Sequence, residues 1–267
     1  NGVLSKKMIS IFFLLILILF LRHVFYWRVK DEYKFQVDKT VFHSHRGYKK
    51  NYPENSLEAI LDAEKIGFQW VEFDIMGTAD GHLVCSHNFD LERETNGKGY
   101  VHKLNKNELK YINNGVYDKT ITPTKICFLD DVIKKTSNKL KYNIEIKAPN
   151  LTDLSTARAL GNIIGSLPVE RIIISSFNPL VLMYFKIFHK KIKTGFLYQN
   201  REYLWVVHIV HPAYLHPRAD LIDEELFTMC KLRNLGINAW TVNNYPAIQW
   251  CKQHNIDGVI TDLEVCR

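Results

Sequence analysis

The chain has 267 residues, a formal net charge of +7 and 46% hydrophobic residues. This composition is too apolar for an intrinsically disordered protein and allows one large domain or two small ones. The five cysteines form no CxxC pair, which argues against a disulfide framework or a zinc site. The basic excess is compatible with a nucleic acid, an anionic membrane or a phosphorylated substrate as partner, and equally with an ordinary solvated surface.

The N-terminal segment differs in composition from the rest of the chain. An apolar run extends from Met8 to Leu21, and aromatic residues follow it up to Trp27. Because about 20 residues are needed to cross a bilayer, we expect a tail at residues 1–7, a single-pass membrane anchor at 8–27 and a polar linker at 28–40. A cleaved signal peptide is the alternative, although no small-x-small cleavage site follows the run. Both flanks are basic, so charge does not predict the orientation.

From Val41 onward, short β-rich runs alternate with helix-like stretches. We expect strands at residues 40–45, 69–75, 82–87, 142–147, 171–177, 194–199, 213–217, 237–242 and 257–261. We expect helices at residues 56–67, 128–138, 154–167, 178–191, 223–236 and 246–255. This alternation over residues 41–267 predicts an α/β fold with a parallel sheet, and its size suits a TIM-like (β/α)8 barrel.

The barrel has eight places for the nine expected strands. The connection GTADG between the second and third runs is too short for the helical crossover that parallel strands require. One unit therefore lacks its helix, or one run is not a barrel strand. Residues 88–124 show weak periodicity and several turn signals, so we interpret them as a small insertion at one rim of the barrel.

Polar residues lie in or directly after several expected strands, where burial would favour apolar ones. Since the carboxyl ends of barrel strands form one face, we expect them to meet there. They are His45 and Arg46, Glu72 and Asp74, His87, Glu145 and Lys147, Ser175 and Ser176, and Trp240 and Asn243.

The chemistry of this set suggests cleavage of a phosphodiester. Glu72, Asp74 and Glu145 offer hard oxygen ligands, which suit Ca²⁺ or Mg²⁺. Arg46 and Lys147 supply positive charge for a phosphate, and two histidines, His45 and His87, can divide general base and general acid roles. Structural alternatives exist: the carboxylates could form salt bridges, the histidines could be hydrogen-bonded strand ends, and Trp240 could be a core residue.

The same residues carry a resemblance to a known family. The segment HRGYKKNYPENSLEAILDAEKIGFQWVEFDIMGTADGHLVCSHNFDLERETNGKGYV, followed by IEIK, SSFNPLVL, GINAWTVNN and DGVITD, closely resembles the glycerophosphodiester phosphodiesterase family. The resemblance extends from about Val41 to Asp262 and implies a TIM-like barrel with a small insertion. It implies an acid–base pair of His45 and His87, and metal ligands Glu72, Asp74 and Glu145 for Ca²⁺ or Mg²⁺.

The resemblance also implies roles for residues around this centre. Arg46 and Lys147 match residues that contact the phosphate, Trp240 matches an aromatic on the glycerol or lipid side, and Glu54 and Asn55 belong to a supporting layer. In one place the chain departs from the family pattern, because Asn88 stands where an Asp usually follows the second histidine. An Asn can hydrogen-bond His87 but adds no negative charge, so we expect a less elevated His87 pKa and a shifted pH optimum.

We therefore expect a membrane-anchored, metal-dependent enzyme that hydrolyses glycerophosphodiesters to sn-glycerol 3-phosphate and an alcohol. Attack on phosphorus by the glycerol 2-hydroxyl, giving a cyclic phosphate, and attack by water both remain open. A lysophospholipase D acting on lysophospholipids at the membrane is the main alternative, and a catalytically silent membrane scaffold is a third. The expected partners are such a substrate and, through the N-terminal helix, membrane lipid, but no nucleic acid.

Overall fold

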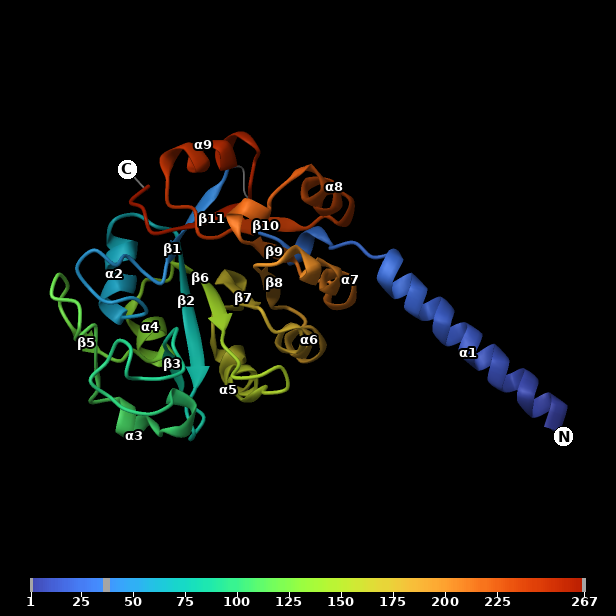
Figure 1. Cartoon of the computed structure of the whole chain (residues 1–267), viewed down its shortest axis with the longest axis horizontal. Coiled ribbons are helices and arrows are strands. Elements are labelled where there is room, and N and C mark those ends of the chain that lie inside the picture. The colour runs from blue at the N-terminus through green and yellow to red at the C-terminus, as the bar shows by residue number, and fades with distance from the viewer. Residues whose placement is uncertain (1, 36–38, 266–267) are drawn as a thin grey trace.

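Eight parallel strands close into a barrel in the computed structural model, which describes residues 2–35 and 39–265 (Figure 1). In order around the barrel they are β1 (Val41–His45), β2 (Trp70–Gly77), β6 (Lys141–Ile146), β7 (Ile172–Ser176), β8 (Lys193–Tyr198), β9 (Tyr214–Pro217), β10 (Gly236–Ala239) and β11 (Gly258–Thr261). Pairing of β1 with both β2 and β11 closes the ring. The predicted TIM-like barrel is confirmed.

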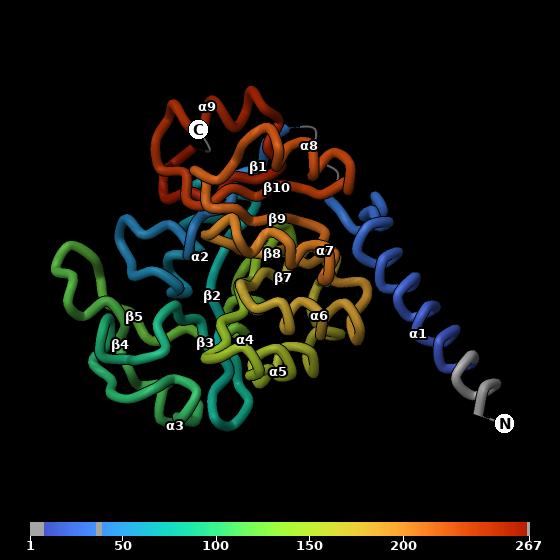
Figure 2. Tube along the Cα trace, turned by 45° about the vertical axis from the view of Figure 1, so that its right-hand side comes forward, coloured from blue at the N-terminus to red at the C-terminus, as the bar shows by residue number. Residues whose placement is uncertain are grey.

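Helices surround the barrel, as the tube in Figure 2 shows. They are α2 (Leu57–Lys65), α4 (Leu129–Lys135), α5 (Ser155–Ile163), α6 (Pro179–Phe188), α7 (Val207–Val210), α8 (Glu224–Arg233) and α9 (Tyr245–Gln253). All but α7 coincide with expected helices. The short α7 follows a 3-10 segment, Arg201–Val206, and neither has the length or the periodicity that would make it visible in the sequence.

The ninth expected strand lies outside the barrel. β3 (Leu83–Cys85) pairs antiparallel with the end of β2, and the turn between them is closed by Thr78, which receives the N–H of His82. The segment 88–124 follows this hairpin and contains α3 (Lys106–Leu109) and β4 (Asn113–Asn114), which pairs with β5 (Thr124–Lys125). This segment lies against the barrel on the side of α2 and α4 in both views.

The N-terminal helix α1 (Gly2–Phe25) extends away from the barrel, and its residues Met8–Phe25 are apolar enough to cross a membrane. It begins within the expected tail and ends two residues before the expected end of the anchor. Trp27 lies beyond the end of the helix. Its side chain is 9% exposed and stacks on His211, with the ring centroids 4.3 Å apart.

The expected linker is not a free polar connection. Val29 is buried, and the Phe35 ring lies edge-on against Trp70 with centroids 4.8 Å apart. The backbone N–H of Phe35 donates to the hydroxyl of Tyr214 over 2.5 Å. Residues 27–35, which we name the docking segment, therefore cover the base of the barrel, at the amino ends of β2 and β9. Residues 36–38 of the expected linker are outside the described residues.

Candidate active site

The turn after β1 presents His45 and Arg46 at the carboxyl end of the barrel. Arg46 and Gly47 both have positive φ, 58° and 83°. A Cβ on Gly47 would lie 2.7 Å from the carbonyl carbon of Ala59, so only glycine fits against α2. The tight turn directs the backbone N–H of Arg46 to a carboxylate oxygen of Glu72 over 3.1 Å. The HRG sequence therefore folds the β1–α2 loop back over the end of β2.

Asn55 holds this loop to β2. Its side-chain oxygen accepts the backbone N–H of Asp74, and its amide donates to Asp74 Oδ2, both over 2.9 Å. Its own N–H donates to the carbonyl of Arg46 over 2.9 Å. Glu54 accepts from the Arg46 guanidinium over 2.7 Å. The two residues thus hold Arg46 and Asp74 in place.

The strand register brings the three predicted metal ligands together. His45 lies beside Glu72 in the β1–β2 pair, and Asp74 lies beside Glu145 in the β2–β6 pair. One oxygen from each of Glu72, Asp74 and Glu145 lies within 4.8 Å of the others, and all three residues are buried. Buried carboxylates of this kind need compensating positive charge, and their oxygen atoms are the ligands that Ca²⁺ and Mg²⁺ prefer.

The protein's own cations compensate this charge only in part. Burial and the neighbouring carboxylates raise the pKa of Glu72 well above its ordinary value. Burial also raises the pKa of Glu145 to about 7, despite Lys147 nearby. At Asp74 burial acts in the same direction, but Lys147 and Arg46 outweigh it and lower the pKa to about 2. Lys147 lies 3.0 Å from Asp74 and also donates to Glu145. The donor set therefore fits a divalent cation.

His45 has a partner that sequence reasoning missed. Its Nδ1 lies 2.8 Å from Oδ1 of Asp262, just beyond the end of β11. The same carboxylate binds Lys49 over 2.8 Å and accepts from the Asn243 amide over 2.6 Å. Although burial opposes ionisation, the contacts with His45 and Lys49 hold the pKa of Asp262 below its ordinary value. An ionised Asp262 favours the tautomer with the proton on Nδ1, which leaves Nε2 of His45 free to accept a proton.

His87 and Asn88 follow β3. Burial lowers the pKa of His87, and nearby Lys147 adds to the effect. The Asn88 amide donates to Glu94 over 2.8 Å, so Asn88 contacts the 88–124 segment. Burial raises the pKa of Glu94. Asn88 therefore follows His87 in the chain, but its side-chain amide donates to Glu94.

A cavity of about 290 Å³ brings most of these side chains together at the carboxyl end of the barrel. Eight of the residues expected at this face line it, namely His45, Arg46, Glu72, His87, Glu145, Lys147, Ser175 and Trp240. Asp74 lies behind this surface and is fully buried. Trp240 donates from its indole to the carbonyl of His216 and lies edge-on against Phe177, so the two rings form an aromatic wall.

Comparison with known proteins agrees with this arrangement. The model of the glycerophosphoryl diester phosphodiesterase family matches residues 45–263, which is most of the chain. The chain belongs to this family. As a family member it is a phosphoric diester hydrolase, and its glycerophosphodiester phosphodiesterase barrel contains the cavity described above.

Individual relatives support the assignment over nearly their whole length. A glycerophosphodiester phosphodiesterase from Caldanaerobacter subterraneus is 33% identical over 229 residues, which cover 84% of this chain and 94% of that protein. One from Bacillus altitudinis is 28% identical, with 84% and 95% covered.

Solved structures show the same fold. A phosphodiesterase from Oleispira antarctica, in complex with the product sn-glycerol-3-phosphate, superposes with a TM-score of 0.75 at 25% identity, covering 84% of this chain and 93% of that one. A glycerophosphodiester phosphodiesterase from Thermotoga maritima superposes with a TM-score of 0.69 at 28% identity, covering 85% and 96%.

Proposed function

We propose that this enzyme hydrolyses glycerophosphodiesters to sn-glycerol 3-phosphate and an alcohol, with two-histidine acid–base catalysis and a bound divalent cation, Ca²⁺ or Mg²⁺. The observation that carries the proposal is the cavity itself. Two histidines, the basic side chains of Arg46 and Lys147, and buried carboxylates meet at one cavity at the carboxyl end of the barrel. The complex of the Oleispira antarctica relative with sn-glycerol-3-phosphate supports the nature of the product.

The proposed division of labour follows from the contacts. A cation held by Glu72, Asp74 and Glu145 would stabilise negative charge that develops on the phosphoryl oxygens. Arg46 and Lys147, at the edge of the same cavity, bind the phosphate. His45 acts as the base, because Asp262 occupies its Nδ1 and Nε2 remains to take the proton of the attacking hydroxyl, from glycerol or from water.

His87 is then the acid. Burial and Lys147 keep its pKa low in the free enzyme, whereas a bound phosphate adds negative charge and favours the protonated imidazole. The protonated His87 donates to the leaving alkoxide. Trp240, beside Phe177, covers the apolar side of the cavity, where the glycerol carbons bind.

We further propose that α1 is a single-pass membrane anchor, and its geometry favours soluble diesters as substrates. The docking segment contacts the first residues of three strands, because Phe35 touches Trp70 of β2, Lys193 of β8 and Tyr214 of β9. The catalytic cavity opens at the opposite ends of the strands. A lysophospholipid in the bilayer would therefore have to reach the end of the barrel that is remote from the anchor.

Choline release from glycerophosphocholine and from lysophosphatidylcholine tests the proposal. Each reaction is run with Ca²⁺, with Mg²⁺ and with a chelator, and His45→Ala serves as the blank. We expect faster release from glycerophosphocholine, which chelator abolishes. A preference for the lysolipid would instead establish a lysophospholipase D. If neither substrate releases choline with either metal, the result would favour a catalytically silent membrane scaffold.

A further inference from the structure

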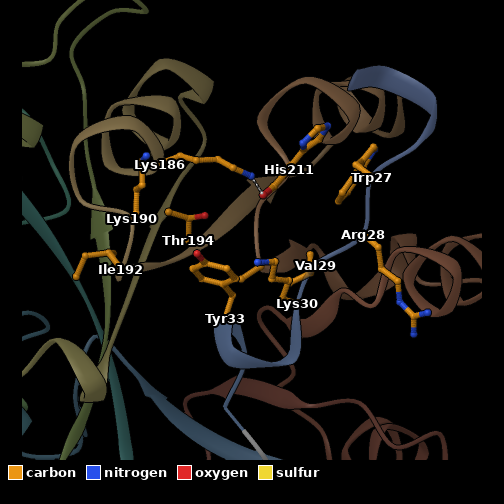
Figure 3. Close-up of a pocket in the computed structure, with 11 residues that line it drawn as sticks. Trp27, Arg28, Val29, Lys30, Tyr33, Lys186, Lys190, Ile192, Thr194 and His211 are labelled. Atoms are coloured by element: carbon orange, nitrogen blue, oxygen red, sulfur yellow. Dashed lines mark hydrogen bonds between the residues drawn. The ribbon is translucent and has the colours of Figure 1, made fainter. Parts of the chain in front are cut away.

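A second cavity lies at the base of the barrel, next to the anchor. It has a volume of about 320 Å³ and lies between the docking segment and the start of β8 and β9. Figure 3 shows Lys186 reaching across one rim and Tyr33 and Lys30 rising from the docking segment on the other side. Among the described residues, none that lines this cavity also lines the catalytic cavity. The chemistry of the two sites is therefore separate.

The polar groups of this cavity are mostly cationic. Lys30, Lys186 and Lys190 line it, and within residues 2–35 and 39–265 no Asp or Glu does. In that part of the chain no salt bridge involves Lys186 or Lys190, while Lys30 makes only an exposed pair with Glu32 at 3.7 Å. Lys186 donates to the backbone carbonyl of His211 over 2.5 Å. Among the described residues, no carboxylate thus neutralises Lys186 or Lys190, and this unpaired positive charge suits an anion.

The walls between these lysines are apolar. Trp27, Val29, Ile192 and Ala213 contribute hydrocarbon surface, and Tyr33 adds an aromatic ring. Figure 3 shows the Arg28 guanidinium pointing away from the cavity, so Arg28 adds its charge to the outer surface. An apolar hollow with a basic rim fits a ligand that has both a hydrocarbon part and a phosphate.

The position of the cavity selects the membrane as the source of such a ligand. Trp27 comes two residues after the end of α1, and no residue from Met8 to Phe25 is buried. His23 near the end of α1 stacks on His211 at 4.1 Å and lies 2.9 Å from the carbonyl of Ile209. The helix end is therefore fixed beside the cavity. When α1 spans a bilayer, the cavity lies at the level of the lipid headgroups.

We propose that this cavity binds the headgroup phosphate of an anionic phospholipid, with its glycerol and upper acyl carbons against the apolar wall. The inference goes beyond catalysis and rests on the proposed membrane position of α1. Lys186 and Lys190 bind the phosphate, and the bound lipid fixes the base of the barrel to the membrane surface. The catalytic cavity then opens away from that surface, toward soluble diesters.

The test is lipid binding to the full chain in detergent, measured by native mass spectrometry with phosphatidic acid and with phosphatidylcholine. The test variant is Lys186→Gln with Lys190→Gln. The matched control is Lys65→Gln with Lys191→Gln. It also removes two positive charges, but neither of these exposed lysines lines the cavity, although Lys191 directly follows Lys190. We expect the affinity of the test variant for phosphatidic acid to be lower by a factor of about ten or more. The control should bind it as the unmodified chain does.

The single variant Lys190→Gln controls for misfolding. It removes one charge and leaves the hydrogen bond from Lys186 to the His211 carbonyl in place. It should weaken binding by a smaller factor at an unchanged melting temperature. Equal binding by test and control variants would overturn the proposal, as would equal affinity for phosphatidylcholine. Displacement of the lipid by millimolar inorganic phosphate would assign the site to a soluble anion instead. Hydrolysis of glycerophosphocholine should be the same in all variants, so failure of the catalytic proposal would be seen separately.

Discussion

Replacing Asn55 with Ala tests whether the loop after β1 holds the carboxylate centre in place. Asn55 is 2% exposed and makes two side-chain hydrogen bonds to Asp74, one to its carboxylate and one to its backbone N–H. It also has a φ of 56°, in a region that Asn tolerates better than Ala. The substitution therefore removes two contacts and adds backbone strain.

The three contributions can be estimated separately. A hydrogen bond to a charged group is worth about 1.5–3 kcal/mol, and a buried N–H left without a partner costs about 1–3 kcal/mol. The strain of Ala at positive φ adds about 1 kcal/mol. We therefore expect Asn55→Ala to lower the free energy of unfolding by about 3.5–7 kcal/mol, which corresponds to a melting temperature lower by roughly 7–28 °C for a domain of this size.

Asn255→Ala is the matched control, because Asn255 is exposed and has a φ of 53°. It measures the strain without the hydrogen bonds. Asn55→Gly gives the complementary control, since Gly keeps the backbone conformation and removes the contacts. Thermal unfolding of all variants, followed by circular dichroism in chelator, measures the effect. A melting temperature for Asn55→Ala within about 2 °C of that for Asn255→Ala would refute the reasoning.

Four further predictions concern charge, position and packing. The pKa of Glu145 is raised to about 7 from its ordinary 4.5, so the folded protein binds this proton more tightly than the unfolded chain, and the stability of the metal-free protein falls as pH rises between these values. Glu145→Gln should therefore raise the melting temperature in chelator more at pH 8 than at pH 5. An equal change at both pH values would contradict this. Asp262→Asn should lower kcat about a hundredfold with little change in KM, because it removes the anion that holds His45 in its tautomer; a change confined to KM would exclude a positioning role. Asn88→Asp should move the alkaline limb of the pH–rate profile upward, because a carboxylate beside His87 favours its protonated form, and an unchanged profile would count against the role of position 88. Phe35→Ala should lower the melting temperature by about 5 °C through lost packing on Trp70, whereas Tyr26→Ala, at a side chain that is 83% exposed, should leave it nearly unchanged; similar losses in both would show that the base of the barrel does not depend on Phe35.

The sequence was sufficient to predict the barrel and most of the side chains that line the cavity at its carboxyl end, and the reason is physical. Strand periodicity placed Glu72 and Asp74 on one face, and charged residues inside apolar strands are conspicuous. The register that pairs Asp74 with Glu145 then brought the carboxylates together. The extra strand was also foreseeable, because the GTADG turn excluded a crossover.

Other features depend on contacts that no local pattern reveals. Asp262 meets His45 across 217 positions of the chain, and one Asp after a strand looks like any other. The docking segment is polar on average, and the burial of Val29 becomes visible only when the barrel is present. The role of Asn88 likewise depends on where Glu94 lies, which the weak periodicity of residues 88–124 does not predict.

The hydrogen bond from Phe35 to Tyr214 joins residues 179 positions apart. Synthesis proceeds from the N-terminus, so α1 leaves the ribosome long before β9 does. The base of the barrel cannot be completed until β9 has been made, and a long loop must then be closed, which slows folding. With α1 as the proposed membrane anchor, the chain would be held at the membrane while the last strands of the barrel are still being made, and docking of residues 27–35 would be among the late events of folding.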